Sequence, residues 1–152
     1  MKRTLKKIIL PILLIAFVGI QFIPTNRNQS DEILPSDITK VFEVPDNILQ
    51  LLQNSCYDCH SNNTNYPWYN KIQPISWMLE NHIQEGKEEV NFSRFGDYST
   101  RKKKSKFKSI ISQLKDGEMP LWSYTLIHRS AKLSEEERKM LVDWMQAQRE
   151  AL

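Results

Sequence analysis

The residues of this sequence with the clearest chemical meaning are two cysteines and a histidine in the run Cys56-Tyr57-Asp58-Cys59-His60. Two thiols separated by two residues can form thioethers with two substituents on one edge of a porphyrin. The histidine that follows directly can then offer an imidazole nitrogen to the iron. The C-x-x-C-H pattern therefore predicts covalent attachment of a c-type haem through Cys56 and Cys59, with His60 as an axial ligand.

Other kinds of site also use cysteine pairs. A structural disulfide is disfavoured, because a C-x-x-C pair is more often redox-active or metal-binding and the chain has no third cysteine. A zinc site needs four ligands, and here the other two would be His82 and His128, which lie far apart in the sequence. A thioredoxin-like dithiol needs a βαβ pattern, which this sequence lacks. Haem is favoured, with zinc and dithiol chemistry as the alternatives.

A second candidate iron ligand lies downstream at Met119, which Pro120 follows directly. Gly117 is expected to end the preceding helix, and the proline favours an extended backbone at Met119, so its thioether is presented from a loop. Such a thioether is a suitable sixth ligand for haem iron, although methionine is usually core filler. His82 and His128 are the alternative sixth ligands, and His82 is expected on the apolar face of a helix.

Aromatic residues and prolines near these ligands are candidates for the walls of a haem pocket. A polar turn after the C-x-x-C-H run leads into an aromatic stretch that is expected to cover one edge of the porphyrin. Ordinary core packing is the alternative, and the two readings overlap because a bound haem is itself part of a core. The pocket candidates are Tyr66, Pro67, Trp68, Tyr69, Pro120, Tyr124 and Trp144.

Helices must position these groups, because glycine is scarce, Leu, Ile, Lys and Glu are abundant, and apolar residues recur at helical spacing. The pattern predicts one helix from residue 46 that delivers Cys56 at its end, and another from Pro74 that Gly86 stops. A third helix, with an apolar stripe from Phe107 to Leu114, is expected to end at Gly117, and a capping box at 134–137 opens the last. The predicted fold is all-α. The expected buried stripes are Ile48, Leu51, Leu52 and Ser55; Ile75, Met78, Leu79, His82 and Ile83; Phe107, Ile110, Ile111 and Leu114; and Met140, Leu141, Trp144 and Met145.

The N-terminus has a different composition from the rest of the chain. Four basic residues at positions 2, 3, 6 and 7 precede an apolar run across residues 8–23, as in an export signal. No A-x-A-like cleavage site follows, so an uncleaved signal-anchor is favoured over a cleaved signal peptide. We therefore expect a signal segment over 1–24, a tether over 25–40 and a haem-binding domain over 41–152. The localisation expected is the cytoplasmic membrane, single-pass, with the haem domain facing the periplasm.

Charge gives little information about partners once this segment is set apart. Without the four basic residues of positions 1–24, the formal net charge falls from +3 to −1, which argues against a nucleic-acid partner. The basic run over residues 101–108 could dock an acidic partner or anionic lipid. The helical stripe in the same region favours a simpler interpretation, in which these lysines form the solvated face of a helix.

A helix that ends in the C-x-x-C-H run, a methionine-proline loop far downstream and a last helix with a buried aromatic residue together resemble the class I cytochromes c. This resemblance implies a cytochrome c-like helical domain wrapped around one covalent haem. More closely, the chain from about residue 40 to 150 resembles the haem-binding domain family of membrane-anchored bacterial cytochromes. The resemblance implies one covalent haem, an exported helical domain, and a role in electron transfer or haem-based sensing. It includes His82 and His128 as well as Met119, so it leaves the sixth ligand open. The motifs that carry it are residues 56–61, Tyr66-Pro67-Trp68-Tyr69, the segment 82–86 with Asn91-Phe92-Ser93, Glu118-Met119-Pro120, and Tyr124 with His128 and Leu133-Ser134.

Three functions compete for such a chain. A monohaem carrier that passes single electrons between redox partner proteins needs two iron ligands and a haem edge near the surface. A peroxidase-type enzyme needs an open iron position and typically a second haem, whereas this chain has one C-x-x-C-H run. A haem-based sensor or ligand-binding module needs a displaceable ligand. The carrier is favoured, and no enzymatic activity is expected.

Overall fold

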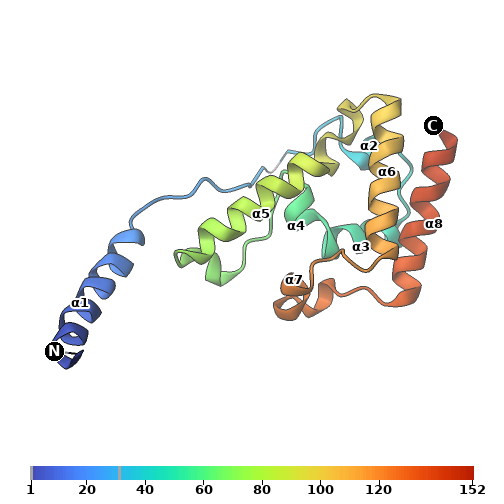
Figure 1. The fold of residues 1–152 in the computed structure, drawn as a ribbon. Helices are drawn as coiled ribbons and strands as arrows, with labels where there is room; N and C mark the ends of the chain where they lie inside the picture. Colours follow the sequence, from blue (N-terminus) through green and yellow to red (C-terminus); the bar gives the residue numbers. More distant parts are fainter. Residues whose placement is uncertain (1, 31) are drawn as a thin grey trace.

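The computed structural model describes residues 2–30 and 32–152, and in that range it contains eight α-helices and three short 3-10 helices (Figure 1). These described residues contain no β-strand, so the prediction of an all-α fold is confirmed. The α-helices are α1 (Lys2–Ile20), α2 (Ile38–Val41), α3 (Asp46–Ser55), α4 (Tyr57–His60), α5 (Ile75–Glu89), α6 (Thr100–Lys115), α7 (Trp122–Ile127) and α8 (Glu135–Ala151). The 3-10 helices are η1 (Trp68–Lys71), η2 (Phe92–Asp97) and η3 (Arg129–Ala131).

Helix α1 projects away from the rest of the molecule (Figure 1). Its length contradicts the prediction that the N-terminal segment is a transmembrane anchor. None of the helices in the described residues is long and apolar enough to cross a membrane. The basic residues at 2, 3, 6 and 7 take up the first turns of α1. The apolar remainder from residue 8 to 20 extends only about 20 Å, against a hydrocarbon core about 30 Å thick. The predicted transmembrane anchor, and the membrane localisation that depended on it, are therefore wrong.

Helix α3 runs directly into the C-x-x-C-H run, whose residues Tyr57–His60 form the short helix α4. Pro45 is the N-cap of α3, and Cys56 is both the C-cap of α3 and the N-cap of α4. The backbone N–H of His60 donates to the Cys56 carbonyl at 2.9 Å, which closes a single helical turn over the motif. The buried residues of α3 are Ile48, Leu51, Leu52 and Ser55, so the predicted stripe is confirmed.

Helix α5 differs from the prediction at its end and in its buried face. It continues through Gly86 to Glu89, so the predicted stop at Gly86 is wrong. Its buried residues are Ser76 and Ile83, whereas Ile75 and Met78 are 43% and 60% exposed. The face is rotated because small residues lie at the contacts: the Ser76 hydroxyl is 3.1 Å from that of Thr25, and Gly86 lies against α4.

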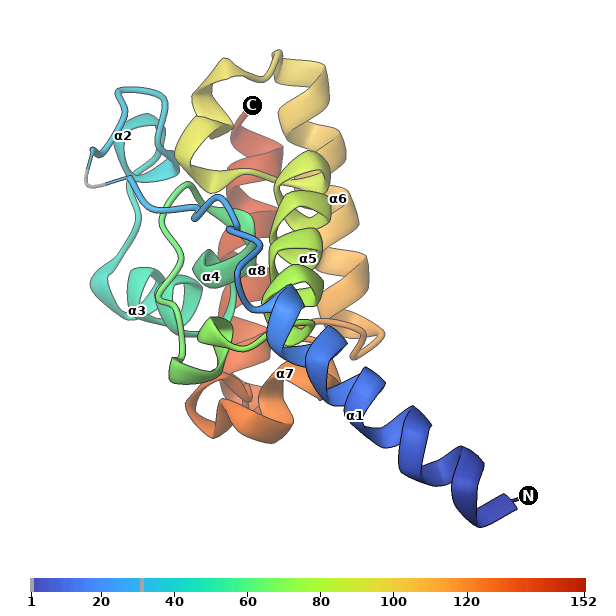
Figure 2. The same cartoon turned by 90° about the vertical axis from the view of Figure 1, so that its left-hand side faces the viewer.

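The core lies where α6 and α8 pack side by side against α3 and η2 (Figures 1 and 2). Phe95 and Phe107 are fully buried, with ring centroids 4.9 Å apart. Full burial of each such side chain is worth about 1.5–3 kcal/mol relative to exposure. Leu141 and Met145 of α8 are also fully buried, but Met140 is 39% exposed, so its predicted burial is wrong. The other stripe residues of α6 that are buried are Ile111 and Leu114.

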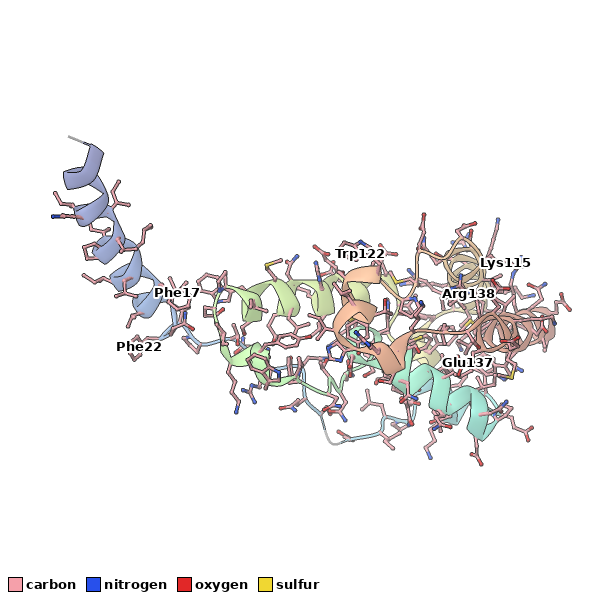
Figure 3. All side chains as sticks on the ribbon, turned by 90° about the horizontal axis from the view of Figure 1, so that it is seen from below. Phe17, Phe22, Lys115, Trp122, Glu137 and Arg138 are labelled. Atoms are coloured by element: carbon pink, nitrogen blue, oxygen red, sulfur yellow. The ribbon has the colours of Figure 1, made fainter. Side chains whose placement is uncertain are left out.

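Helix α8 begins close to the end of α6. The predicted capping box is confirmed: the Glu137 N–H donates to the Ser134 hydroxyl at 3.2 Å, and the Ser134 N–H donates to the Glu137 carboxylate at 2.8 Å. Arg138, which follows the box, donates from Nη1 to the Leu114 carbonyl at 3.0 Å (Figure 3). The start of α8 and the end of α6 are thereby joined.

The segment predicted as a tether lies against the helical domain and is hydrogen-bonded to it. Asn28 makes most of these bonds: its backbone N–H donates to the Tyr66 hydroxyl at 2.7 Å, and its Nδ2 donates to the Ser61 carbonyl at 2.8 Å. Thr64 donates its backbone N–H to the Asn28 carbonyl at 2.9 Å. Segment 25–30 therefore braces the turn that follows the C-x-x-C-H run (Figure 2).

Candidate functional site

The side chain of His60 is held by two main-chain carbonyls of α5 and its cap. Its Nδ1 lies 2.8 Å from the Gly86 oxygen and 3.0 Å from the Val90 oxygen. Both partners are acceptors, so Nδ1 carries the proton and donates to them. Burial lowers the pKa of His60, and the bonds to Val90 and Gly86 only partly oppose that shift. The imidazole is therefore neutral, and its Nε2 keeps a lone pair, which is the state that binds a metal.

Gly86 allows α4 to approach α5 closely enough for this arrangement. A Cβ at Gly86 would lie 2.7 Å from the Cys59 carbonyl oxygen and 3.2 Å from its Cβ. Gly86 does not have a positive φ, so its backbone conformation does not require glycine. Glycine is needed here because a side chain would collide with the backbone of Cys59. The same glycine supplies one of the carbonyls that orient His60.

A cavity of about 210 Å³ lies beside His60, between α3, the end of α5, α6 and the loop after α6. It brings together three residues predicted for the site, because Cys56, His60 and Met119 all line it. Pro120 lines it too, as predicted for a pocket residue. The remaining lining residues are Ser55, Glu89, Val90, Phe92, Ser109, Ile110, Gln113 and Leu114.

Met119 reaches the cavity from a loop whose start is fixed to the end of α6. Gly117 has a φ of 72°, which reverses the chain after the helix in a conformation that side chains disfavour. The backbone N–H groups of Glu118 and Met119 both donate to the Gln113 carbonyl, at 3.0 and 3.3 Å. Met119 is half-buried. Met119 therefore lies on a loop, as predicted, and lines the cavity together with His60.

The two thiols differ from the low-pKa thiols of dithiol catalysts. Burial raises the pKa of Cys56 to about 12, and burial with the nearby Asp58 charge raises that of Cys59 to about 11. Dithiol catalysis uses a thiolate with a lowered pKa. In addition, within the part of the chain that the structure describes, no three His, Cys, Asp or Glu side chains converge to hold a metal ion. Cys59 is half-buried and does not line the cavity.

The two alternative sixth ligands lie elsewhere. His82 is exposed on α5, because the buried face of that helix is rotated away from it, so its predicted place on the apolar face is wrong. His128 pairs with another group: its Nε2 is 2.7 Å from the Tyr69 hydroxyl. Neither histidine lines the cavity, whereas Met119 does.

None of the aromatic pocket candidates lines the cavity. Trp68 is 76% exposed. Tyr66 donates to Glu80 at 2.9 Å, and burial raises its pKa to about 12. Trp144 stacks edge-on against Phe107, with ring centroids 6.2 Å apart, on the core side of α6. Pro67, Tyr69 and Tyr124 also lie outside the cavity lining.

Sequence analysis missed the walls of the cavity and the groups that orient His60. Phe92 is buried and packs edge-on against the His60 ring at 6.2 Å between centroids. Val90 contributes both a wall and the second carbonyl. The available signal was Gly86, because a glycine inside an otherwise helical run indicates a close packing contact as well as a helix end.

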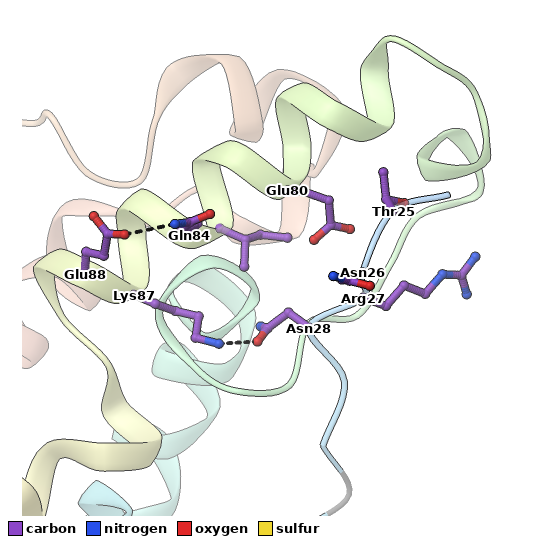
Figure 4. A pocket seen from close by; sticks show the side chains of 9 residues that line it. Thr25, Asn26, Arg27, Asn28, Glu80, Gln84, Lys87 and Glu88 are labelled. Atoms are coloured by element: carbon purple, nitrogen blue, oxygen red, sulfur yellow. Dashed lines mark hydrogen bonds between the residues drawn. The ribbon is translucent and has the colours of Figure 1, made fainter. Parts of the chain in front are cut away.

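A larger pocket, of about 490 Å³, lies between segment 25–28 and α5 (Figure 4). Its polar groups bond to one another: Lys87 donates to the Asn28 side-chain oxygen, and Gln84 donates to Glu88 at 3.1 Å. Neither cysteine and no histidine lines it. We therefore place the candidate site in the smaller cavity, which Cys56, His60 and Met119 line.

Comparison with known proteins agrees with this geometry. A family model described as a haem-binding domain matches residues 15–147, which is most of the chain. The chain belongs to the haem-binding domain family. This confirms the suspected family and supports a haem protein. No curated protein and no solved structure matches the chain.

The residues of the cavity fit a haem. His60 offers a neutral imidazole nitrogen, Met119 a thioether, and Cys56 a thiol. Val90, Phe92, Ile110 and Leu114 give the cavity apolar walls, which suit the faces of a porphyrin. The buried hydroxyl of Ser55 has no hydrogen-bond partner among the described residues and lies in the lining, so a polar group at the edge of a porphyrin would satisfy it.

Proposed function

We propose that this haem protein is a monohaem c-type electron carrier, with haem attached through Cys56 and Cys59 and iron held by His60 and Met119. The observation that carries the proposal is that Cys56, His60 and Met119, which come from two distant parts of the chain, line one cavity. Redox partner proteins would supply and accept the electrons.

Residues from two parts of the chain would hold the haem iron. Neutral His60, oriented by two carbonyls, would donate Nε2 to the iron, and Met119 would donate its sulfur from the loop. When bound, the haem iron supplies a ferric–ferrous couple, whose potential rises with a methionine ligand and with burial. The apolar walls would exclude water from the site, and the partly exposed cavity rim would leave an edge for electron exchange.

A carrier is favoured over an enzyme or a sensor because a donor side chain is available for each of the two axial positions. A peroxidase or a ligand sensor needs one position left open to solvent. His60 and Met119 both line the cavity, so ligation by the two would use both positions. The proposal therefore predicts six-coordinate haem in the ferric and the ferrous state.

Covalent attachment is tested by haem staining after denaturing electrophoresis of the full chain matured in a host competent for c-type assembly. We expect wild-type protein to retain stain, with one haem per chain by the pyridine haemochrome assay. Cys56→Ala and Cys59→Ala should each lose two-point attachment, because each removes one thioether. Ser55→Ala is the matched control, since it alters the same lining without removing a thiol.

Absence of covalent haem from wild-type protein would contradict the proposal. A potentiometric titration of the wild type should give a reversible one-electron curve, and stain lost from Ser55→Ala as fully as from Cys56→Ala would contradict the assignment of the thiols.

A further inference from the structure

Helix α7, which follows the methionine loop, is fastened to the C-x-x-C-H run by one strong hydrogen bond. The Tyr124 hydroxyl donates to Oδ2 of Asp58 at 2.5 Å. Asp58 lies between the two cysteines, and its other carboxylate oxygen accepts the backbone N–H of Asn65 at 2.9 Å. The acceptor is therefore held in place by the turn after the motif. A hydrogen bond to a charged acceptor is stronger than one between neutral groups.

The ring of Tyr124 is fixed as well as its hydroxyl. It stacks on the His128 ring, with centroids 4.4 Å apart and planes inclined by 12°. His128 is in turn hydrogen-bonded to Tyr69, which lies in η1. Tyr124 is thus joined directly to the motif and, through His128, to η1. The cluster of Asp58, Tyr69, Tyr124 and His128 lies outside the cavity lining.

From this geometry we infer that Tyr124 is a positioning residue for Met119, acting through its hydrogen bond to Asp58. The inference rests on the proposed function, because it concerns the methionine that would bind the iron. The loop that bears Met119 has two ends. The first is tied to α6 through the Gln113 carbonyl, and the second passes into α7, which Tyr124 ties to the motif.

The consequence follows from how loops hold their side chains. With both ends fixed, Met119 has few positions and the thioether stays beside the cavity. With the second end released, the loop gains conformational freedom, which is lost again each time the thioether binds. A competing ligand then displaces methionine more readily, although the haem stays attached and His60 keeps its own two hydrogen bonds.

The test is an imidazole titration of the ferric, haem-loaded full chain, followed by absorbance, with Tyr124→Phe compared to wild type. This substitution removes the hydroxyl but keeps the ring that stacks on His128. We expect Tyr124→Phe to bind imidazole with an apparent affinity about tenfold higher, which corresponds to about 1.4 kcal/mol. Asp58→Ala removes the same bond from the other partner, and the double variant should show no further gain.

Tyr66→Phe is the matched control. It also removes a phenol that donates to a carboxylate, Glu80 at 2.9 Å, but Tyr66 lies outside the cavity and is not attached to the methionine loop. It should leave the imidazole affinity at the wild-type value even where it lowers the urea midpoint. A role for Tyr124 in general stability alone would lower the urea midpoint and leave the imidazole affinity unchanged.

The outcomes separate this inference from the proposed function. Methionine-ligated ferric haem has a weak red charge-transfer band, called the methionine band here. If ferric wild type shows this band, and if Tyr124→Phe and Asp58→Ala both bind imidazole with the wild-type affinity, the positioning role is wrong and the ligand assignment stands. If imidazole affinity rises equally in Tyr66→Phe, the role is also wrong, because the effect is then general. A wild type without the methionine band overturns both.

Discussion

The two sides of the cavity hold their iron-ligand candidates in different ways. On the histidine side, His60 lies in a helix and its ring packs edge-on against Phe92. Its Nδ1 is hydrogen-bonded to two main-chain carbonyls. On the methionine side, Met119 lies in a loop, is half-buried, and donates its backbone N–H to the Gln113 carbonyl. The imidazole is oriented directly, whereas the thioether depends on what fixes the ends of its loop.

This difference indicates that the two ligands should fail in different ways. Perturbing the histidine side requires moving α4 against α5, because both hydrogen bonds of the ring are made to main-chain carbonyls of α5 and its C-cap. Perturbing the methionine side requires only that the loop gain freedom. A carrier benefits from the first arrangement because the site is preorganised for the iron, and the second sets how easily a competing ligand enters.

The largest effect on the histidine side is expected for Gly86→Ala. The new Cβ would meet the Cys59 backbone at 2.7 Å, so α4 and α5 must separate, at a cost of about 2–3 kcal/mol in the free energy of unfolding. The shift also moves the carbonyl that orients His60, so we expect a high-spin component in the ferric spectrum. Urea unfolding and absorption spectra of the haem-loaded protein measure both effects.

Gly96→Ala is the control for that prediction. Its Cβ would also make close approaches, at 2.8 Å from Val41 Cγ2 and 2.9 Å from Ser36 Cα, but these nearest atoms belong to residues outside the motif. It should lower stability without changing the spectrum. Equal spectral change in both variants would show that the histidine side is not oriented by the contact at Gly86.

A smaller effect is expected from pH, and only on the histidine side. Because burial lowers the pKa of His60 in the folded chain, the unfolded chain binds more protons below about pH 6.5. Stability of the haem-free chain should therefore be unaffected by this group above that pH and fall as pH decreases below it. One proton changes the free energy by about 1.4 kcal/mol per pH unit, so the loss between pH 7.5 and 5.5 is at most about 1.4 kcal/mol.

Urea midpoints of the haem-free chain at the two pH values, with His60→Gln as the control, measure this contribution. The control removes the titrating group, so its midpoint should fall less between the two pH values. An identical fall in both proteins would assign the acid sensitivity to other residues. Met119 itself has no titrating group.

The same contrast explains what the sequence could predict. Local rules located the stripe of α3, the capping box at Ser134 and the reversal at Gly117, because each depends on residues close together in the chain. The loop-borne position of Met119 followed from Gly117 and Pro120 in the same way. These predictions needed only spacing and backbone preference.

Features that depend on distant contacts were not predictable. Which face α5 buries is decided by the packing of Ser76 and Gly86 against other segments, so His82 was assigned to the wrong face. The bond between Tyr124 and Asp58 joins residues far apart in the chain and leaves no local pattern. The spanning length of the N-terminal helix was overestimated, because the apolar run was counted to residue 23 while α1 ends at Ile20.

The ferric absorption spectrum of Met119→Ala beside wild type tests the ligand pair most directly. Wild type should show the weak red charge-transfer band of methionine-ligated ferric haem. Met119→Ala should lose that band, keep covalent haem and show a lower reduction potential, because methionine favours the reduced state. His82→Ala and His128→Ala should keep the band. A wild type without the band, in which His82→Ala alone alters the spectrum, would contradict the assignment of His60 and Met119.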